Sequence, residues 1–313
     1  MYMDATQGYQ IGTPGVKWSN TEKSQWRAQQ EIKRSYKEQV LDVLDGLGEE
    51  FELIQYGALS CAPDDYPLFI IKSKNWKNDC ENVFVTGGVH GYETSGVHGA
   101  LCFALTEAKN YLSKFNFVIA PCISPWGYET INRWNSNAVD PNRSFYRDSP
   151  SEEASALMSY ISALATEFIT HIDLHETTDT DNSEFRPALG ARDAIEQKNW
   201  NIPDGFYLVG DSTKPVDLFQ KAIINKVKTV THIAPADEEQ RLIGEPLAQF
   251  GVINYAAREL GLCMGLTDAP YVTTTEVYPD SPLVNDKNCI NAQVAVITAA
   301  LDYLSQLPAS KLA

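Results

Sequence analysis

The chain has few basic residues for its length, and they form no cluster. Lys and Arg together number 25 against 41 Asp and Glu in 313 residues, so the formal net charge at pH 7 is -16. A negative surface repels nucleic acid and anionic lipid unless a local basic patch overrides it, and no run of Lys and Arg supplies one. We therefore expect neither nucleic acid nor membrane as a partner.

Long apolar runs and paired cysteines are also missing. No window is apolar over the length that crosses a bilayer, and Met1 to Ile11 shows no basic segment followed by an apolar stretch, which predicts a soluble, cytoplasmic protein. The six cysteines are widely spaced and form no C-x-x-C pair, so reduced and mostly buried thiols are expected rather than a disulfide framework.

The segments that are present alternate between strand-like and helix-like patterns. This alternation predicts an α/β fold with a mixed, mainly parallel central sheet covered by helices on both faces. We expect one catalytic domain over 1–313, onto which a leading loop and helix in 1–50 pack. Strands are expected at 51–56, 68–72, 82–86, 115–123, 168–174 and 271–277, helices at 21–47, 95–111, 151–168 and 288–307, and long loops over 176–246.

His90-Gly-Tyr-Glu93 directly follows a strand that ends in Gly87-Gly88. Open α/β sheets bind ligands beyond the carboxyl ends of their strands, and imidazole and carboxylate are both good Zn²⁺ ligands. An H-x-x-E pair also occurs by chance, so this pair alone is weak evidence for a metal.

His175 stands at the end of another predicted strand, in Ile172-Asp-Leu-His175, and should reach the same edge of the sheet. A catalytic zinc takes three protein ligands and keeps an open position, so His90, Glu93 and His175 together make a plausible set. The alternative for His175 is a hydrogen-bonded histidine that ends a strand. His98, His171 and His232 have no comparable partners and are interpreted as structural.

Glu276 lies in the β-branched strand Val272-Thr-Thr-Thr-Glu276-Val277, beside apolar neighbours. A partly buried carboxylate near a cation can accept a proton from an activated water, which makes Glu276 the candidate general base. A glutamate that faces solvent from an edge strand is the alternative.

Taken in order, these residues resemble the M14 zinc carboxypeptidases and the related aspartoacylase and succinylglutamate desuccinylase group. Members show H-x-x-E, then R-x-N-x-x-x-V-D-x-N-R, then D-L-H, then T-x-E near the end. The corresponding stretches here are His90 to Glu93, Arg133 to Arg143, Asp173 to His175, and Thr274 to Glu276. The ordered combination is far more specific than any single stretch.

The resemblance implies one Zn²⁺ per chain and further site residues. Arg133 would polarise the scissile carbonyl, Asn142 and Arg143 would bind a free substrate carboxylate, and Asp140 would orient the first zinc histidine. A planar guanidinium forms two parallel hydrogen bonds to a carboxylate, which suits the selection of a chain end. Taken alone, Arg133 and Arg143 would be interpreted as members of surface ion pairs.

Several positions depart from the family pattern. Ser124-Pro-Trp-Gly127 replaces N-P-D-G, and D-P-N-R-S replaces D-L-N-R-N. The mobile tyrosine of carboxypeptidases has two candidates, Tyr255 and Tyr271, without a matching motif. The carboxylates of 176–181 could suggest a second metal, although a solvated loop is the preferred interpretation.

The sequence thus predicts a zinc metallocarboxypeptidase that hydrolyses the C-terminal peptide bond with Glu276 as general base. The nearest alternative is an N-acyl amino acid deacylase, which would use almost the same residues on an N-acyl amino acid with a free carboxylate. A second alternative is an inactive module that only binds carboxylates. The sequence leaves the oligomeric state open.

Overall fold

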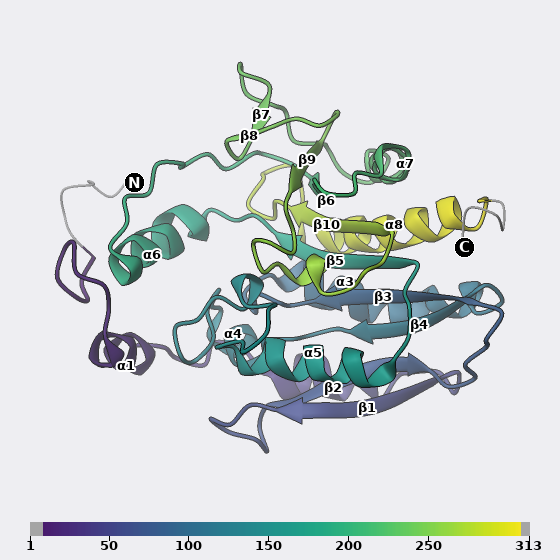
Figure 1. Ribbon diagram of the computed structural model, residues 1–313, viewed down its shortest axis with the longest axis horizontal. Helices are drawn as coiled ribbons and strands as arrows, with labels where there is room; N and C mark the ends of the chain where they lie inside the picture. Colours follow the sequence, from purple (N-terminus) through teal and green to yellow (C-terminus); the bar gives the residue numbers. More distant parts are fainter. Residues whose placement is uncertain (1–8, 308–313) are drawn as a thin grey trace.

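An eight-stranded sheet forms the centre of the molecule (Figure 1). The computed structural model describes residues 9–307, so both ends of the predicted domain, 1–8 and 308–313, lie outside the described residues. The strand order is β1-β2-β4-β3-β5-β10-β6-β9. The strands are β1 (Phe51–Ala58), β2 (Pro67–Ser73), β3 (Glu81–Gly87), β4 (Phe115–Ala120), β5 (Thr170–Glu176), β6 (Tyr207–Asp211), β9 (Val252–Tyr255) and β10 (Tyr271–Val277).

The middle of the sheet is parallel. β4, β3, β5 and β10 pair in parallel, as do β6 and β9, whereas β1 with β2, β2 with β4, and β10 with β6 are antiparallel. The strand β4 is buried along its whole length, as expected for a parallel strand covered on both faces. The predicted mixed, mainly parallel sheet is therefore confirmed.

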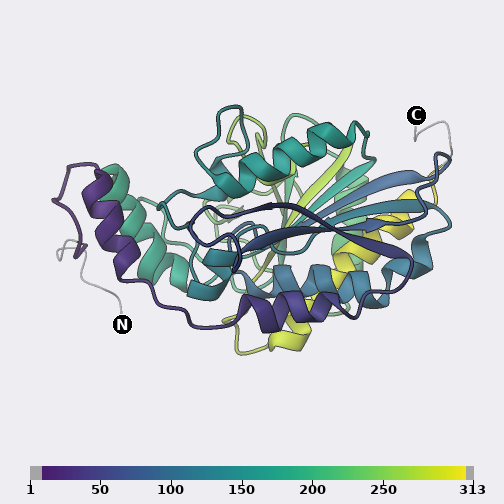
Figure 2. The same cartoon turned by 90° about the horizontal axis from the view of Figure 1, so that it is seen from below.

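Helices cover both faces of this sheet (Figure 2). Alternate side chains of β3 show the two layers, since Val83 and Val85 pack in the core under α3 and α8 while Phe84 packs with Leu157 of α5 on the other face. The helices are α1 (Asn20–Ala28), α2 (Asp42–Leu44), α3 (Thr94–Thr106), α4 (Pro125–Thr130), α5 (Glu152–Leu164), α6 (Arg186–Asp193), α7 (Asp217–Val227) and α8 (Asp286–Leu304). Shorter turns are η1 (Lys37–Leu41), η2 (Ala108–Tyr111), η3 (Pro141–Arg143), η4 (Asp181–Phe185) and η5 (Cys263–Gly265).

The predicted helix over 21–47 is wrong in its middle. The segment forms α1, then a non-helical stretch, then η1 and α2. Tertiary contacts replace helical hydrogen bonds there, because the backbone N–H groups of Lys33 and Arg34 donate to Glu129 O and that of Tyr36 donates to Glu129 Oε1. Local propensity favoured one helix, and these long-range bonds interrupt it.

The prediction of long loops over 176–246 is also wrong in part. The stretch contains η4, α6, β6 and α7, together with a small ribbon formed by β7 (Arg241–Leu242) and β8 (Glu245–Pro246). β6 is a buried strand of the central sheet, and it pairs with β10 and β9. Within β6 the apolar run Tyr207 to Val209 is followed at once by Gly210 and Asp211, two residue types that are rare in strands, so no strand pattern stands out.

The structure shows the state of the cysteines and the lengths of the apolar helices. All six cysteines are free thiols, but only Cys122, Cys263 and Cys289 are buried, while the other three are half-buried. Within residues 9–307, no helix is both long and apolar enough to cross a bilayer.

Candidate active site

The candidate site residues meet at the carboxyl ends of β3, β5 and β10. Glu276 of β10 pairs with His175 of β5, and Gly87 at the end of β3 pairs with Leu174. His90 follows β3 by three residues, so all three polar side chains reach one edge of the sheet. This placement is the one expected from the sequence.

Close packing against α4 (Pro125–Thr130) fixes the path of the chain between His90 and Glu93. A side chain at Gly91 would place its first carbon 2.0 Å from the backbone nitrogen of Tyr128. Glu93 directly precedes α3 and does not cap it, because Glu176 accepts hydrogen bonds from the backbone N–H groups of Thr94 and Ser95 instead. The Glu93 carboxylate is thereby left to face the histidines.

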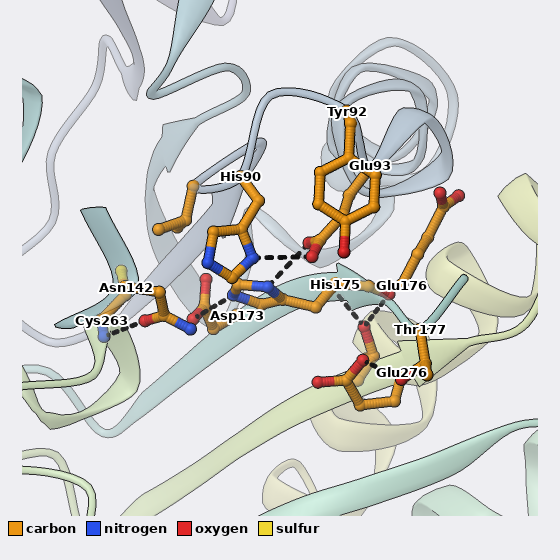
Figure 3. A network of polar contacts seen from close by, with 12 residues as sticks. His90, Tyr92, Glu93, Asn142, Asp173, His175, Glu176, Thr177, Cys263 and Glu276 are labelled. Atoms are coloured by element: carbon orange, nitrogen blue, oxygen red, sulfur yellow. Dashed lines mark hydrogen bonds and ion pairs between the residues drawn. The ribbon is translucent and has the colours of Figure 1, made fainter. Parts of the chain in front are cut away.

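His90, Glu93 and His175 converge in a buried cluster (Figure 3). The Nδ1 atoms of both histidines lie 2.7 Å from the Glu93 carboxylate, that of His90 from Oε1 and that of His175 from Oε2. The two rings are nearly perpendicular, at 77°, with their centres 5.1 Å apart. The three donor atoms lie within 4.8 Å of one another.

This donor set suits a zinc ion. Glu93 Oε2 is buried and accepts no hydrogen bond from any described residue. It lies 2.7 Å from His175 Nδ1, but the two groups are not aligned as a hydrogen bond. Burial alone would raise the pKa of Glu93, but His175 and His90 lower it to about 2, so the carboxylate is ionised. Two imidazole nitrogens and a carboxylate that face each other are the usual ligands of a catalytic zinc.

A second carboxylate holds each histidine from the far side of its ring. His90 Nε2 lies 3.0 Å from Asp140 Oδ1, and His175 Nε2 lies 2.8 Å from Asp173 Oδ2. Burial opposes ionisation of both aspartates, but neighbouring positive groups lower the pKa of each. Such contacts fix which nitrogen faces a metal.

Arg133 lies half-buried at the wall of the site. Its Nε donates to Asp140 Oδ2 at 3.0 Å, and its Nη1 lies 3.7 Å from Asp181 Oδ1. Burial alone would lower the pKa of Arg133, but Asp140 and further negative groups raise it well above its usual value. The guanidinium is therefore a fixed positive charge beside the histidines.

Asn142 and Arg143 follow Asp140 in η3. The Oδ1 atom of Asn142 accepts a 2.7 Å hydrogen bond from the backbone N–H of Cys263, which leaves the amide NH₂ as the donor available to a ligand. Arg143 Nη1 donates to Asn142 O, and no described carboxylate lies within 4 Å of the guanidinium. Arg143 is exposed to water where it lines a cleft, and its partial desolvation there lowers the pKa of the guanidinium.

Glu276 is half-buried on an interior strand, which excludes the edge-strand interpretation. Thr177 Oγ1 donates to Glu276 Oε2 at 2.8 Å, so the Tyr207 hydroxyl 2.8 Å away donates in turn to Thr177. Burial raises the pKa of Glu276 to about 8, and the negative charge of Glu93 acts in the same direction. A group of this kind gains and loses a proton near neutral pH.

These residues line one cleft of about 900 Å³. Tyr255 also lines it, whereas Tyr271 lies between Phe219 and Tyr303 and is absent from its lining. The leading segment forms part of the wall through Trp18, together with α6.

The interpretation of 176–181 as a solvated loop is wrong for most of its residues. Glu176, Thr177, Thr178 and Asp181 are buried, and only Asp179 is exposed. Tyr92 donates from its hydroxyl to Asp181 at 3.1 Å. In the described part of the chain, these carboxylates form no group of three donors that could hold a second metal.

His171, Asp173 and Cys263 form a second group of close donor atoms. The Thr86 hydroxyl bonds to all three, at 3.0 Å to His171 Nε2, 2.6 Å to Asp173 Oδ1 and 3.6 Å to Cys263 Sγ. The cluster is therefore a hydrogen-bonded network centred on Thr86, and Asp173 connects it to His175. His171 thus has partners that the sequence did not indicate, as do His98 with Tyr128 and His232 with Asp204.

Some residues of the site were missed in the sequence. Asp173, Thr177 and Tyr207 contact a candidate ligand or the candidate base directly or through one hydroxyl. Of these three, only Asp173 could have been found from the sequence. It lies two residues before His175, and residues two apart in a strand share one face. Tyr207 lies on the unpredicted strand β6, so nothing local indicated it.

Comparisons with known proteins agree with this picture. The model of the Peptidase_M14 family, described as zinc carboxypeptidase, matches residues 65–186. A search of curated protein sequences finds no significant match.

Solved structures share the fold at low sequence identity. A candidate metallopeptidase from Shewanella amazonensis SB2B has a TM-score of 0.65 at 17% identity, over 88% of this chain and 99% of that one. A metallo-carboxypeptidase from Burkholderia cenocepacia has a TM-score of 0.58 at 16% identity, over 86% and 69%. The carboxypeptidase A of Helicoverpa armigera has a TM-score of 0.57 at 13% identity, over 88% and 75%.

Identities this low establish the fold alone. The resemblance noted in the sequence is nevertheless confirmed, since the family model spans the stretch that includes His90, Glu93, Arg133, Arg143 and His175. The chain has the fold of the zinc carboxypeptidases and, over residues 65–186, matches the sequence pattern of that family.

Proposed function

We propose that the chain is a zinc metallocarboxypeptidase that removes the last residue of peptides with a free C-terminal carboxylate. The observation that carries this proposal is one cleft that holds both a zinc-type ligand set and Arg143, a guanidinium without a carboxylate partner. The first feature supports hydrolysis, and the second supports recognition of a chain end.

His90, Glu93 and His175 would hold the metal, with Asp140 and Asp173 fixing the two imidazoles. When bound, Zn²⁺ would supply Lewis acidity, which lowers the pKa of a water and polarises the substrate carbonyl.

Glu276 would move the proton. Thr177 occupies Oε2 of this carboxylate, so Oε1 is the oxygen free to take a proton from the attacking water. The same atom would then deliver that proton to the nitrogen of the leaving residue. A cation nearby favours the ionised carboxylate, so we expect the pKa of Glu276 to fall from about 8 once metal binds.

Arg133 would stabilise the charge that develops on the carbonyl oxygen. Asp140 holds its Nε and Asp181 lies near its Nη1, so the guanidinium is oriented before substrate arrives. Preoriented donors of this kind cost little reorganisation during the reaction.

Asn142 and Arg143 would bind the substrate's terminal carboxylate. Asn142 offers its amide NH₂ because Cys263 fixes its oxygen, and Arg143 offers a forked guanidinium. Charge-assisted pairs of this type are among the strongest hydrogen bonds in proteins.

Turnover of matched substrates by zinc-loaded protein tests the proposal. We expect about one zinc per chain by metal analysis, cleavage of peptides with a free carboxylate, and little cleavage of the same peptides as C-terminal amides. Glu276→Gln should keep the zinc and lose about 10²- to 10⁴-fold in kcat.

Other outcomes would contradict it. Cleavage of N-acyl amino acids but not of peptides would indicate a deacylase, and zinc binding without any turnover would indicate a carboxylate-binding module. Equal cleavage of acid and amide would remove the role given to Arg143.

A further inference from the structure

Four arginines line the active-site cleft, and they fall into two pairs. Arg133 and Arg192 are neutralised, the first by Asp140 at 3.0 Å and the second by Asp193 at 2.8 Å. Arg143 and Arg186 have no carboxylate within 4 Å among residues 9–307. The cleft therefore presents two positive groups without counterions, and a C-terminal carboxylate would neutralise one.

Arg186 makes only neutral contacts. Its Nη1 donates to the Asn182 side chain at 2.5 Å and, at 3.3 Å, to the backbone oxygen of Asn201. Burial lowers the pKa of Arg186, and the positive charge of Arg133 acts in the same direction, although Asp181 opposes them. A guanidinium taken partly out of water without a directly paired carboxylate is costly, so its retention in a cleft is informative.

Tyr255 lines the same cleft as the two unneutralised arginines. Burial raises the pKa of its phenol to about 12, and Arg143 and Arg186 both act in the opposite direction. The negative charges of Glu245 and of Glu276, the candidate base, raise it. Both guanidiniums and the candidate base thus line one cleft.

Two lysines are further cations of the cleft lining. Lys17 and Lys23 of the leading segment line the same cleft, and neither forms an ion pair within 4 Å with a described residue. The cleft lining also includes seven carboxylates, of which Glu93, Asp140, Asp181 and Asp193 already lie within 4 Å of a histidine or an arginine.

We infer that the substrate is an acidic peptide, with Asp or Glu at its last or second-last position, and that Arg186 binds that side-chain carboxylate. This inference rests on the proposed function and names its substrate class. Arg143 would take the terminal carboxylate, and Arg186 would pair with the second one next to the cleaved bond.

The test compares glutamate with glutamine, which differ in charge but hardly in shape. Four N-acylated peptides of equal length would end in Ala-Glu, Ala-Gln, Glu-Ala and Gln-Ala. With zinc-loaded protein we expect kcat/KM to favour glutamate at one of the two positions by roughly 10- to 100-fold, as for a charge-assisted hydrogen bond.

Arg186→Gln should abolish this preference and leave turnover of the favoured position's glutamine peptide within about threefold, since only the charge pair is lost. Arg147→Gln is the matched control, because Arg147 is 96% exposed and outside the cleft lining. A purely structural role for Arg186 would instead lower Tm and weaken turnover of all four peptides alike.

Two results would overturn the inference. One is equal turnover of glutamate and glutamine peptides at both positions by the unmodified protein. The other is a glutamate preference that survives in Arg186→Gln.

Failure of the proposed function can be told apart from these results. Calorimetric binding of the same peptides to zinc-loaded Glu276→Gln reads the preference without turnover. A peptide that binds with the glutamate preference but is never cut by the unmodified protein would refute the peptidase and keep the acidic subsite.

Discussion

Asp173 and His175 stand two positions apart in β5, so their side chains share one face of the strand. This spacing lets Asp173 Oδ2 reach His175 Nε2 at 2.8 Å while Thr86, its register partner on β3, donates to Oδ1 at 2.6 Å. Asp173, which Thr86 fixes in position, thus holds the imidazole of His175 in place. Asp140 holds His90 in the same manner from a separate loop.

We predict that Asp173→Asn weakens zinc binding by about 10- to 100-fold, because the neutral amide orients the imidazole less firmly and makes it less basic. Competition with a chromophoric chelator measures this affinity. His171→Gln is the control, since His171 shares the face but forms no hydrogen bond to His175. An unchanged affinity in Asp173→Asn would show that the contact has no part in metal binding.

At the scale of single residues, the sequence was most informative where chemistry and strand ends coincide. His90, Glu93, His175 and Glu276 were all predicted, and the structure brings them together. The sequence did not single out Arg186, because its lack of a carboxylate partner among residues 9–307 is a property of the folded chain and not of the local sequence.

At the scale of elements, the central strands of the sheet could be predicted from the sequence, whereas the leading segment and strand β6 could not. β3, β5 and β10 carry enough β-branched and aromatic residues to be recognised, and α8 shows a clear helical period. The leading segment was misread because long-range contacts break its helix, and such contacts are not visible in a local window of sequence. β6 was missed because Gly210 and Asp211, residue types that are rare in strands, end its apolar run.

Arg34 anchors the non-helical stretch of the leading segment to the rest of the chain. Its guanidinium donates to Tyr128 O, to Thr94 Oγ1 and to Gly91 O, all at 2.6 to 2.8 Å, and lies over the Tyr128 ring at 3.6 Å. Gly91 lies in the turn that carries the candidate ligands His90 and Glu93, and Thr94 begins α3 directly after Glu93. The leading segment therefore braces that turn as well as forming part of the cleft wall.

Arg34→Met should lower the free energy of unfolding by about 2 kcal/mol, since three acceptors lose a charged donor while the aliphatic stem is retained. Urea denaturation measures this, and chelator competition should show zinc affinity reduced several-fold as the turn loosens. Lys33→Met is the matched control, because Lys33 is an exposed neighbouring cation. Equal stability of the two variants would contradict the bracing role.

At the scale of the whole molecule, charge is unevenly distributed. The whole chain has 25 Lys and Arg against 41 Asp and Glu, whereas the lining of its main cleft is nearly balanced, with six against seven. The same acidity means that lowering the pH brings the molecule closer to neutrality, so a loss of stability on mild acidification must come from specific buried groups. His171 is the clearest of these.

His171 is fully buried behind the site, and its Nδ1 has no hydrogen-bond partner. Burial lowers its pKa to about 4, below the ~6.5 of an unfolded histidine. The unfolded chain therefore binds more protons between these values. The contribution to stability is complete above pH 6.5 and is lost as the pH falls towards 4.

We expect the unmodified protein to lose about 2 kcal/mol of unfolding free energy from this histidine between pH 7 and pH 5. His171→Gln cannot charge, so its urea-unfolding free energy should fall by about 2 kcal/mol less over the same interval, even if it is less stable at pH 7. Groups common to both proteins cancel in this difference. Parallel pH profiles would mean that His171 is not the group that makes the fold sensitive to acid.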